Sequence, residues 1–499
     1  MTPPRPLIVV SLPARTVSEA RSEVAEAMAD GADIAELRVD RLADGEVGRL
    51  DGLFPSPLPL IATLRSRSEG GEGPDEAELR FPLLRRLARY PFRWIDAERS
   101  RDFPAAETLS RPGIQELIVS THLPSETSGS QWGHLLREPA PTGALVKVVG
   151  PSSVGQLLRE LIPSFPPIEE RSYIAHTTGA SGPLLRAWSK RFGFPLVFAS
   201  LPERYVPGRP TTVEPSQIPV DRLKPFLDAG GTSPLYAVVG HPVAHSRSPA
   251  LFSRWMREDG RTGLYVALDF GSDEEFTDAV PALTEGGFHG LSVTHPFKAV
   301  ALELADEVGP GATACGVANT LMLGVDGVSA ENTDLVAILR RLGELRTSGA
   351  WDGESVGVVG AGGAARATLA AARALGVEAF VWARRERASE ALAREFGAHS
   401  VPTAGTTRPS LVVHATPVGR ASETHASRPD LSWLRPGVHV VDWVYAPDDP
   451  IVRATADRCH ATYEDGTRLL VYQAAASYGL WWGAEPSADR VESALRSFS

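Results

Sequence analysis

The chain has 499 residues, a hydrophobic fraction of 43% and a formal net charge of −11 at pH 7. This length and apolar fraction predict roughly three globular domains with packed cores. The acidic balance, with no basic stretch interleaved with aromatic residues, argues against nucleic acid as a partner, because phosphate binding needs clustered positive charge. We therefore expect a folded, soluble protein whose partners are small molecules.

Targeting and metal signals are missing from the sequence. No run of about 18 apolar residues occurs, and "MTPPRPLIVVSLPAR" passes directly into a short strand without an apolar region long enough for secretion. We expect a cytoplasmic protein that contacts no membrane. The two cysteines, Cys315 and Cys459, come without a CxxC or HExxH motif. This pattern excludes a disulfide scaffold and predicts no metal site.

The first half of the chain alternates short apolar runs with segments of helical spacing. One such segment, 16–31, has Ser18 as a possible N-cap and Gly31 at its end. Strand–helix units repeated over about 225 residues are typical of a closed (β/α)₈ barrel, and a doubly wound open sheet is the alternative. The eight predicted strands lie within 6–12, 33–40, 59–66, 92–98, 116–122, 144–150, 171–178 and 194–201.

The regular alternation of strands and helices is interrupted near residues 228–234, where Gly-Gly and Ser-Pro pairs precede a new strand. We place the main domain boundary there. We expect a barrel over 1–229 and then a two-lobed α/β dehydrogenase. Its first lobe covers 234–335 and is completed by C-terminal helices over 469–499. Its second lobe, a Rossmann-like nucleotide-binding unit, covers 336–468.

Charged side chains collect at the ends of the barrel strands. The strand within 33–40 alternates Glu36, Arg38 and Asp40, so all three point to one face. Taken alone, that row fits a structural ion network as well as a site. The following strand ends add Arg65, Glu69, His122 and Lys147. Arginine pairs with carboxylates and glutamate accepts from hydroxyls, so the set suits a polyol carboxylate.

Lys147 stands out because the chain contains only four lysines: Lys147, Lys190, Lys224 and Lys298. A lysine amine among apolar side chains is shifted toward its neutral form and can attack a ketone to give a Schiff base, whereas a guanidinium cannot. A nearby imidazole, His122, can move the protons that a dehydration requires. The alternatives are a lysine that reaches the surface and a histidine that is only part of the core.

The sequences "ELRVD", "TLRSRSEGG", "STH" and "VKVV", in this order, make residues 5–225 resemble the type I 3-dehydroquinate dehydratases, which are (β/α)₈ barrels. The resemblance implies that Lys147 is the Schiff-base lysine and that His122 is the general acid/base, oriented by Glu69. It further implies that 3-dehydroquinate is bound by Glu36, Arg38, Arg65 and Arg186.

The last loop of that barrel aligns in two ways. Both "VPGRPT", with Arg209, and "EPSQIPVDRL", with Gln217, can match the family's Pro-Gly-Gln loop. We expect Gln217 to be the active-site residue, because the sequence after it matches better. A serine that often precedes this loop in the family is Val213 here.

In the second half, Lys298 ends "GLSVTHPFK" and Asp334 ends "AENTD". An ammonium held by a carboxylate can give a proton to the alkoxide left by ketone reduction, although a surface ion pair is the alternative. Residues 235–499 resemble the shikimate dehydrogenases. The resemblance implies substrate contacts from Ser246, Ser248, Thr294, Asn319, Tyr445 and Gln473. Two positions where that family usually has Asn are Ser292 and His414 here.

The stretch "VVGAGGAAR" follows a strand and precedes an alanine-rich helix, as a pyrophosphate-binding turn requires. After the next strand, Arg384 and Arg385 stand where an acid would hold a ribose hydroxyl, which favours NADP over NAD; the alternative is that they only solvate a helix start. The predicted cofactor-binding residues are Gly360, Gly362, Gly363, Ala364, Ala365, Arg384, Arg385, Thr416 and Gly466.

The sequence thus predicts a bifunctional enzyme that dehydrates 3-dehydroquinate to 3-dehydroshikimate and reduces that product to shikimate with NADPH. Two alternatives stay open. The second half could be a quinate dehydrogenase that uses NAD, or the chain could be a ligand-sensing regulator that has lost its chemistry. The oligomeric state is not predicted.

Overall fold

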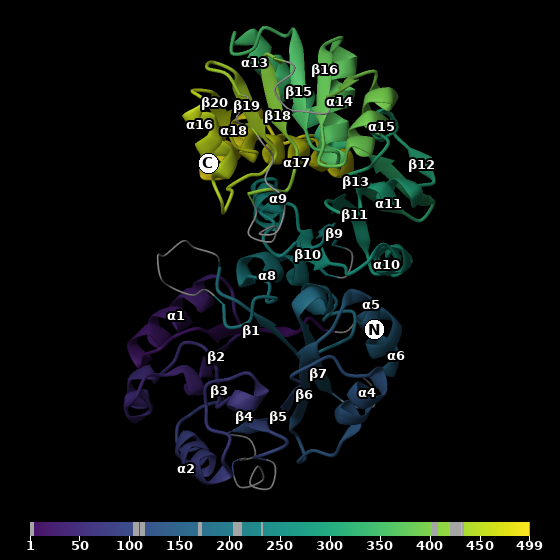
Figure 1. Cartoon of the computed structure of the whole chain (residues 1–499). Coiled ribbons are helices and arrows are strands. Elements are labelled where there is room, and N and C mark those ends of the chain that lie inside the picture. Colours follow the sequence, from purple (N-terminus) through teal and green to yellow (C-terminus); the bar gives the residue numbers. More distant parts are fainter. Residues whose placement is uncertain are drawn as a thin grey trace. The chain divides into compact units, whose positions relative to one another are not determined.

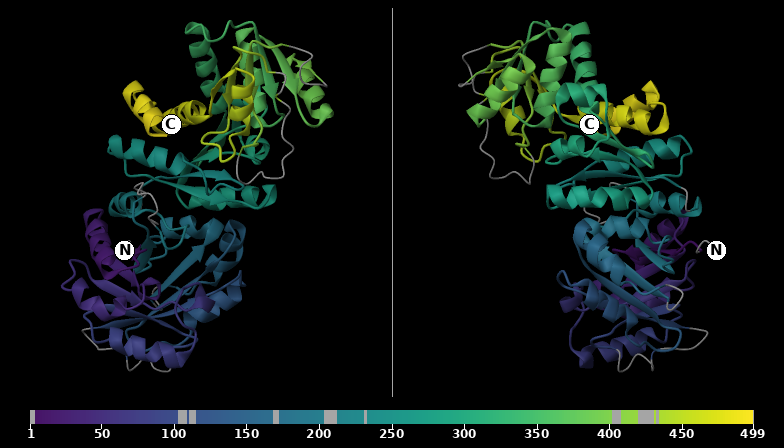
Figure 2. Two further views of the ribbon diagram at one scale, coloured as in Figure 1. Left: turned by 60° about the vertical axis from the view of Figure 1, so that its left-hand side comes forward. Right: turned by 90° about the vertical axis from the view of Figure 1, so that its right-hand side faces the viewer.

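The computed structural model describes the chain except for residues 1–3, 103–108, 110–114, 168–171, 203–211, 231–232, 402–407, 420–430, 432–433 and 499. The chain divides into two compact units (Figures 1 and 2). One contains Met1–Leu235 with Arg261–Gly287, and the other contains Tyr236–Gly260 with Phe288–Ser499.

The N-terminal region is an eight-stranded sheet of parallel neighbours in the order β7-β6-β5-β4-β3-β2-β1-β8 (Figure 1). Seven of the strands lie within the predicted apolar runs, and β6 ends one residue beyond its run, which confirms the barrel. The strands are β1 (Leu7–Leu12), β2 (Ile34–Arg38), β3 (Leu60–Thr63), β4 (Trp94–Glu98), β5 (Glu116–His122), β6 (Leu145–Pro151), β7 (Tyr173–Thr178) and β8 (Leu196–Ala199).

Helices connect these strands. The first, α1 (Val17–Ala29), begins one residue after Thr16, whose side chain accepts from Glu19 N while the Glu19 side chain returns a bond to the Thr16 backbone. The N-cap is therefore Thr16 and not Ser18, because the chain is still extended at Thr16 and this capping box satisfies free backbone donors. The others are α2 (Ala77–Leu87), α4 (Gly129–Arg137), α5 (Val154–Gln156), α6 (Ile162–Ser164), α7 (Gly182–Ala187) and α8 (Val220–Asp228).

Side chains bridge the gap between β7 and β8, for which the described residues show no strand ladder. Arg186 donates from Nε to Phe198 O (3.1 Å) and from Nη1 to Thr177 O (2.8 Å). His176 Nε2 accepts from Phe198 N at 3.3 Å. The barrel is nearly closed as a result. Every strand contributes to its apolar interior, which contains the buried residues Val9, Ile34, Ile61, Trp94, Ile118, Ile174, Leu196 and Phe198 and the partly buried Leu145 of β6.

A second, six-stranded sheet has the order β10-β9-β11-β13-β14-β12. Its pairs β11/β13 and β13/β14 are antiparallel. The strands are β9 (Leu235–Gly240), β10 (Leu264–Asp269), β11 (Phe288–Val293), β12 (Glu307–Val308), β13 (Thr320–Gly324) and β14 (Gly327–Glu331). The helices in this stretch are α9 (Ser248–Glu258), α10 (Asp273–Glu285), α11 (Lys298–Glu303), α12 (Pro310–Cys315) and α13 (Thr333–Thr347).

The third sheet is parallel, in the order β17-β16-β15-β18-β19-β20. The chain runs outward from β15 in both directions, so β15 marks a topological switch point and confirms a Rossmann-like lobe. The strands are β15 (Ser355–Val359), β16 (Glu378–Trp382), β17 (His399–Ser400), β18 (Leu411–His414), β19 (His439–Asp442) and β20 (Thr462–Glu464). The helices are α14 (Gly363–Leu375), α15 (Glu386–Phe396), α16 (Ile451–Arg458), α17 (Thr467–Trp482) and α18 (Ala488–Phe498).

Within the described ranges, no helix is long and apolar enough to cross a membrane. The same residues contain no group of three or more His, Cys, Asp or Glu side chains that could hold a metal ion.

Candidate active sites

A cavity of about 520 Å³ opens at the carboxyl ends of the barrel strands, where (β/α)₈ enzymes place their active sites. The structure brings together all of the barrel residues that the sequence predicted. The wall of this cavity includes Glu36, Arg38, Arg65, Glu69, His122, Lys147, Arg186 and Gln217. The alternative loop residue, Arg209, lies outside the described residues.

Lys147 projects from β6 and is only 4% exposed. Its Nζ donates to Asp96 Oδ2 at 3.1 Å, lies 3.9 Å from Glu36 Oε1, and sits 3.9 Å from the centre of the Phe198 ring. The surroundings are therefore less apolar than the sequence suggested. A buried amine between carboxylates and an aromatic face is held in one position, facing the cavity.

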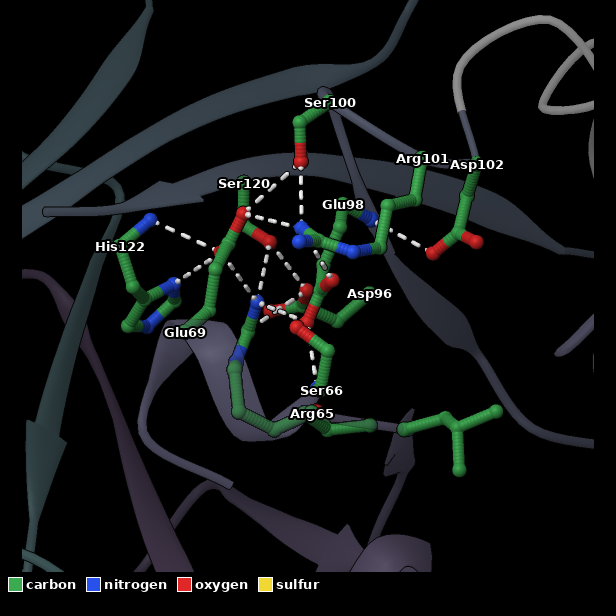
Figure 3. A network of polar contacts seen from close by, with 12 residues as sticks. Arg65, Ser66, Glu69, Asp96, Glu98, Ser100, Arg101, Asp102, Ser120 and His122 are labelled. Carbon is green, nitrogen blue, oxygen red and sulfur yellow. Dashed lines mark hydrogen bonds and ion pairs between the residues drawn. The ribbon is translucent and has the colours of Figure 1, made fainter. Parts of the chain in front are cut away.

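Glu69 lies between Arg65 and His122 and contacts both (Figure 3). The backbone N–H of His122 donates to Glu69 Oε2 at 2.9 Å, and the ring Nδ1 lies 3.3 Å from the same oxygen without the geometry of a hydrogen bond. Arg65 Nη1 donates to Glu69 Oε2 at 3.1 Å, and Ser100 donates to Oε1 at 3.2 Å. These contacts fix the carboxylate that was expected to orient His122.

Burial and charge set the protonation of these groups. Burial, together with the Arg65 and Lys147 cations, lowers the pKa of His122 well below its usual value. Its imidazole is therefore neutral near pH 7 and able to take a proton. Burial raises the pKa of Glu69. The nearby Arg65 guanidinium favours the charged carboxylate and so reduces this increase without cancelling it.

Asp96 is a site residue that the sequence analysis missed. It is fully buried on β4, accepts from Lys147, and forms an ion pair with Arg65 Nη2 at 2.9 Å. Burial alone would raise the pKa of Asp96, but the Arg65 and Lys147 cations outweigh it and hold that pKa below its usual range. The signal was present: Trp94, Asp96 and Glu98 alternate along one strand, as Glu36, Arg38 and Asp40 do.

All three predicted substrate-binding arginines, Arg38, Arg65 and Arg186, already have partners in the chain. Arg38 forms a bidentate pair with Asp40 at 2.7 and 2.9 Å. Arg186 is 2% exposed, donates to three backbone carbonyls, and offers Nη2 to Glu214 Oε2 at 3.3 Å. Arg186 therefore joins β7 to β8 in addition to lining the cavity.

Gln217 and Glu36 close the other wall. Gln217 Nε2 donates to Ser11 Oγ at 3.1 Å, and Ser11 donates to Glu36 Oε2 at 2.6 Å. Thr63 Oγ1 donates to Glu36 Oε1 at 2.7 Å. Glu36 is thus held as an acceptor beside Lys147 by two hydroxyls, neither of which the sequence analysis identified.

A second cavity, of about 490 Å³, contains the other lysine site. Lys298, the first residue of α11, donates to Asp334 Oδ2. Asp334 Oδ1 accepts from Asn319 Nδ2 at 3.0 Å, and Asn319 Oδ1 accepts from Thr333 N at 2.7 Å. Because Asn319 and Asp334 are 3% and 4% exposed, the pair is built into the fold and is not a surface ion pair. The remaining predicted substrate residues, Ser246, Ser248, Thr294, Tyr445 and Gln473, line the same cavity.

The glycine turn between β15 and α14 forms another wall of this cavity. Gly360 has φ +132°, and a Cβ there would lie 2.5 Å from Ala415 O. The predicted cofactor residues in the cavity wall are Gly360, Gly362, Gly363, Ala364, Arg384, Arg385 and Thr416. Ala365 is buried inside α14, and Gly466 packs behind Trp443, so a direct cofactor contact for these two stays a prediction.

The chain therefore has two sites of an α/β enzyme. One is the barrel cavity with its buried lysine, and the other is the cavity that the lysine–aspartate pair shares with the Rossmann-like lobe. Residues 8–230 match the family model of type I 3-dehydroquinase, and residues 238–321 match that of the shikimate dehydrogenase substrate binding domain. The chain belongs to the shikimate dehydrogenase family through its C-terminal half and joins to it a type I 3-dehydroquinase barrel. Both resemblances are thereby confirmed.

Individual relatives agree with this assignment. The chain is 38% identical over 268 residues to the shikimate dehydrogenase (NADP(+)) of Cereibacter sphaeroides, covering 51% of this chain and 94% of that one. Its identity to the shikimate dehydrogenase (NADP(+)) of Acidiphilium cryptum is 35% over 267 residues, covering 52% and 94%.

Among solved structures, shikimate 5-dehydrogenase from Thermus thermophilus in complex with NADP(H) and shikimate has 31% identity and a TM-score of 0.47, covering 53% of this chain and 100% of that one. The dehydroquinate dehydratase and shikimate dehydrogenase of S. pombe AroM has 24% identity and a TM-score of 0.41, covering 99% and 98%.

Proposed function

We propose that this chain catalyses two consecutive reactions, the dehydration of 3-dehydroquinate to 3-dehydroshikimate and the NADPH-dependent reduction of that product to shikimate. The observation that carries the proposal is the pair of lysine-centred cavities. In one, Lys147 shares the wall with His122, and in the other, Lys298 and Asp334 share it with the glycine turn.

In the barrel, the Lys147 amine attacks the ketone carbon, and loss of water gives an iminium between Nζ and that carbon. The positive nitrogen makes the neighbouring C–H acidic. His122, neutral and held through Glu69, takes that proton as a general base. The electron pair forms the new double bond as the hydroxyl leaves, and His122 returns its proton to that hydroxyl, which departs as water. Hydrolysis of the iminium frees Lys147 and 3-dehydroshikimate.

Glu36, Asp96 and Arg65 support this sequence by position. Asp96 Oδ2 and Glu36 Oε1 lie 3.1 and 3.9 Å from Lys147 Nζ, so negative charge is available where the iminium develops. Arg65 is bound by Asp96, Glu98 and Glu69 and keeps their carboxylates together in the buried wall. We expect Arg38, Gln217 and Arg186 to bind the substrate's hydroxyls and carboxylate.

In the dehydrogenase half, the residues present fit a dinucleotide. A Cβ at Gly362 would meet nothing within 4 Å, so this face of the turn is open at the start of α14. Arg384 and Arg385 are exposed in the cavity wall, and within the described part of the chain neither forms an ion pair, which leaves both for a 2′-phosphate. NADPH supplies a hydride when bound.

Lys298 supplies the matching proton. Its ammonium, held on Asp334, hydrogen-bonds the ketone oxygen, polarises the carbonyl, and transfers a proton to the oxygen as the alcohol forms. Asn319 and Thr333 keep Asp334 in place, so the ion pair does not have to rearrange during the reaction.

The test is a coupled assay in which the intact chain receives 3-dehydroquinate and NADPH. We expect 3-dehydroshikimate to form without nicotinamide and to be converted to shikimate when NADPH is added. Reduction of 3-dehydroquinate itself with NADH in preference would favour a quinate dehydrogenase, and tight binding without turnover would favour a regulator. The cytoplasmic location expected from the sequence stays a prediction.

A further inference from the structure

A buried chain of three side chains leads from the core of the Rossmann-like lobe to its cavity. His414 and Asp442 end the neighbouring parallel strands β18 and β19, with their Cα atoms paired, and are 0% and 1% exposed. His414 Nδ1 lies 2.8 Å from Asp442 Oδ1, and His414 Nε2 lies 2.6 Å from Thr416 Oγ1. Thr416 lines the cavity beside the glycine turn.

The other contacts of Asp442 determine where the protons lie. Val444 N donates to Oδ1 at 3.0 Å, and the Tyr463 hydroxyl donates to Oδ2 at 3.2 Å. The Asp442 carboxylate accepts hydrogen bonds from Val444 N and from the Tyr463 hydroxyl. It also acts as the acceptor in its contact with the imidazole, so His414 Nδ1 carries a hydrogen. In a neutral imidazole the other nitrogen, Nε2, is then an acceptor. Thr416 must therefore direct its own hydroxyl hydrogen inward, to His414.

This arrangement fixes what Thr416 can offer to a ligand. With its hydrogen given to His414 and the Val418 N–H donating to it at 3.3 Å, Oγ1 presents only lone-pair density to the cavity. It suits a hydroxyl or amide donor and not a phosphate oxygen, which is itself an acceptor.

The sheet order indicates which part of the dinucleotide Thr416 faces. β16, followed by Arg384 and Arg385, lies on one side of β15, and β18, followed by Thr416, lies on the other. In doubly wound folds a dinucleotide spans the switch point, with its two nucleotide halves on opposite sides. Arginines that take the 2′-phosphate therefore leave the nicotinamide half to the side of Thr416.

We propose that His414 and Asp442 are positioning residues that hold Thr416 Oγ1 as the hydrogen-bond acceptor for a hydroxyl of the nicotinamide-side ribose. The inference rests on the proposed function of this lobe as an NADP site. The pair acts through Thr416 and touches no ligand itself.

The first experiment measures the tautomer of His414 directly, without NADP. The full chain is labelled with ¹⁵N-histidine, and the His414 signals are assigned from the spectrum of His414→Gln, or from the shifts caused by Thr416→Val should the first variant fail to fold. At neutral pH we expect Nδ1 protonated and Nε2 unprotonated. An Nε2–H tautomer or a doubly protonated ring would overturn the proposal.

The second experiment measures binding of NADP and of adenosine 2′,5′-bisphosphate, which lacks the nicotinamide half, by calorimetry. Thr416→Val keeps the shape but removes the acceptor, so we expect about three- to tenfold weaker NADP binding and unchanged bisphosphate binding. Thr416→Ser should bind NADP nearly as the parent does. Arg384→Gln should weaken both ligands.

Equal weakening of both ligands by Thr416→Val, or no weakening of NADP, contradicts the contact with the nicotinamide-side ribose. If the unmodified chain binds neither ligand, the proposed function of the lobe is wrong, and the histidine spectrum still decides whether the buried hydrogen-bond chain exists.

Discussion

At the scale of single residues, Lys147 shows both the strength and the limit of sequence reasoning. Its rarity among the basic residues and its place in an apolar run identified it, and the structure places it in the cavity with His122. The carboxylate beside its amine, Asp96, belongs to a strand 51 residues earlier. Which strands become neighbours across a barrel depends on tertiary packing, so that partner could not be read from the local pattern.

We expect Lys147→Arg to abolish dehydration while leaving shikimate oxidation intact, because a guanidinium cannot form the imine. Borohydride added with 3-dehydroquinate should attach the substrate covalently to Lys147 in the parent chain and not in the variant, as mass spectrometry of the peptides would show. Lys224→Arg, which alters a lysine paired with Asp228 on α8, is the matched control and should keep both the adduct and the activity. An adduct on another residue, or dehydration by Lys147→Arg, would falsify the assignment.

The lowered pKa of His122 predicts that the dehydratase keeps its activity in mild acid. Since the pKa of His122 lies well below 6.5, the neutral base persists as the pH falls through 6.5. We expect kcat/KM for dehydration to stay level from about pH 8 to about pH 6.5 and to decline only at lower pH. The exposed His134→Gln variant should give the same profile. A decline centred at or above pH 6.5 would show that His122 is not the base or is not shielded.

The same shift in pKa affects stability, with a definite sign. Below pH 6.5 the unfolded chain protonates this histidine while the folded chain does not, so the unfolded state binds more protons. The contribution of His122 to the free energy of unfolding therefore decreases as the pH falls from 6.5 toward the lower pKa that this histidine has in the folded state.

At the scale of elements, the turn between β15 and α14 was predictable because its chemistry is local. Strand, glycines and helix follow one another, and Gly360 must adopt a positive φ with its Cα against Ala415. The start of α1 was predicted less well: Ser18 and Thr16 both suit an N-cap, and only the reciprocal bonds of Thr16 and Glu19 select between them. The two-residue strands β12 and β17 are too short to show any periodicity.

Two alanine variants test this turn. Gly360→Ala imposes a side chain at φ +132° and against a backbone carbonyl, so we expect a loss of about 1–3 kcal/mol of stability. Gly362 has φ −89°, and a Cβ added there would meet nothing within 4 Å, so Gly362→Ala should leave the stability unchanged. Thermal unfolding followed by circular dichroism should show one transition lowered by several degrees in the first variant only. Similar midpoints for both variants would contradict the strained geometry of Gly360.

At the scale of the whole molecule, the sequence predicted a barrel followed by a two-lobed α/β region with a Rossmann-like lobe, because strands and helices alternate along the chain. The exact limits of the domains remain predictions. The chain leaves α8 at Asp228 and begins β9 at Leu235, and Gly230 between them has φ +87°. The compact unit that holds the barrel also includes Arg261–Gly287. That segment supplies β10 and α10, and β10 belongs to the same sheet as β9.

The last prediction is that the two activities survive separation between residues 230 and 231. Each half has its own lysine-centred cavity and its own strands, so neither should need the other's backbone to fold. A protease site inserted there allows each preparation to be assayed before and after cleavage, with the uncut protein as its control. Residues 1–230 should produce 3-dehydroshikimate without nicotinamide, and residues 231–499, which retain the whole of Arg261–Gly287, should reduce it with NADPH. If cleavage abolishes either partial reaction while the uncut protein stays active, one half depends on the other for its fold, and the boundary near residues 228–234 does not separate independent domains.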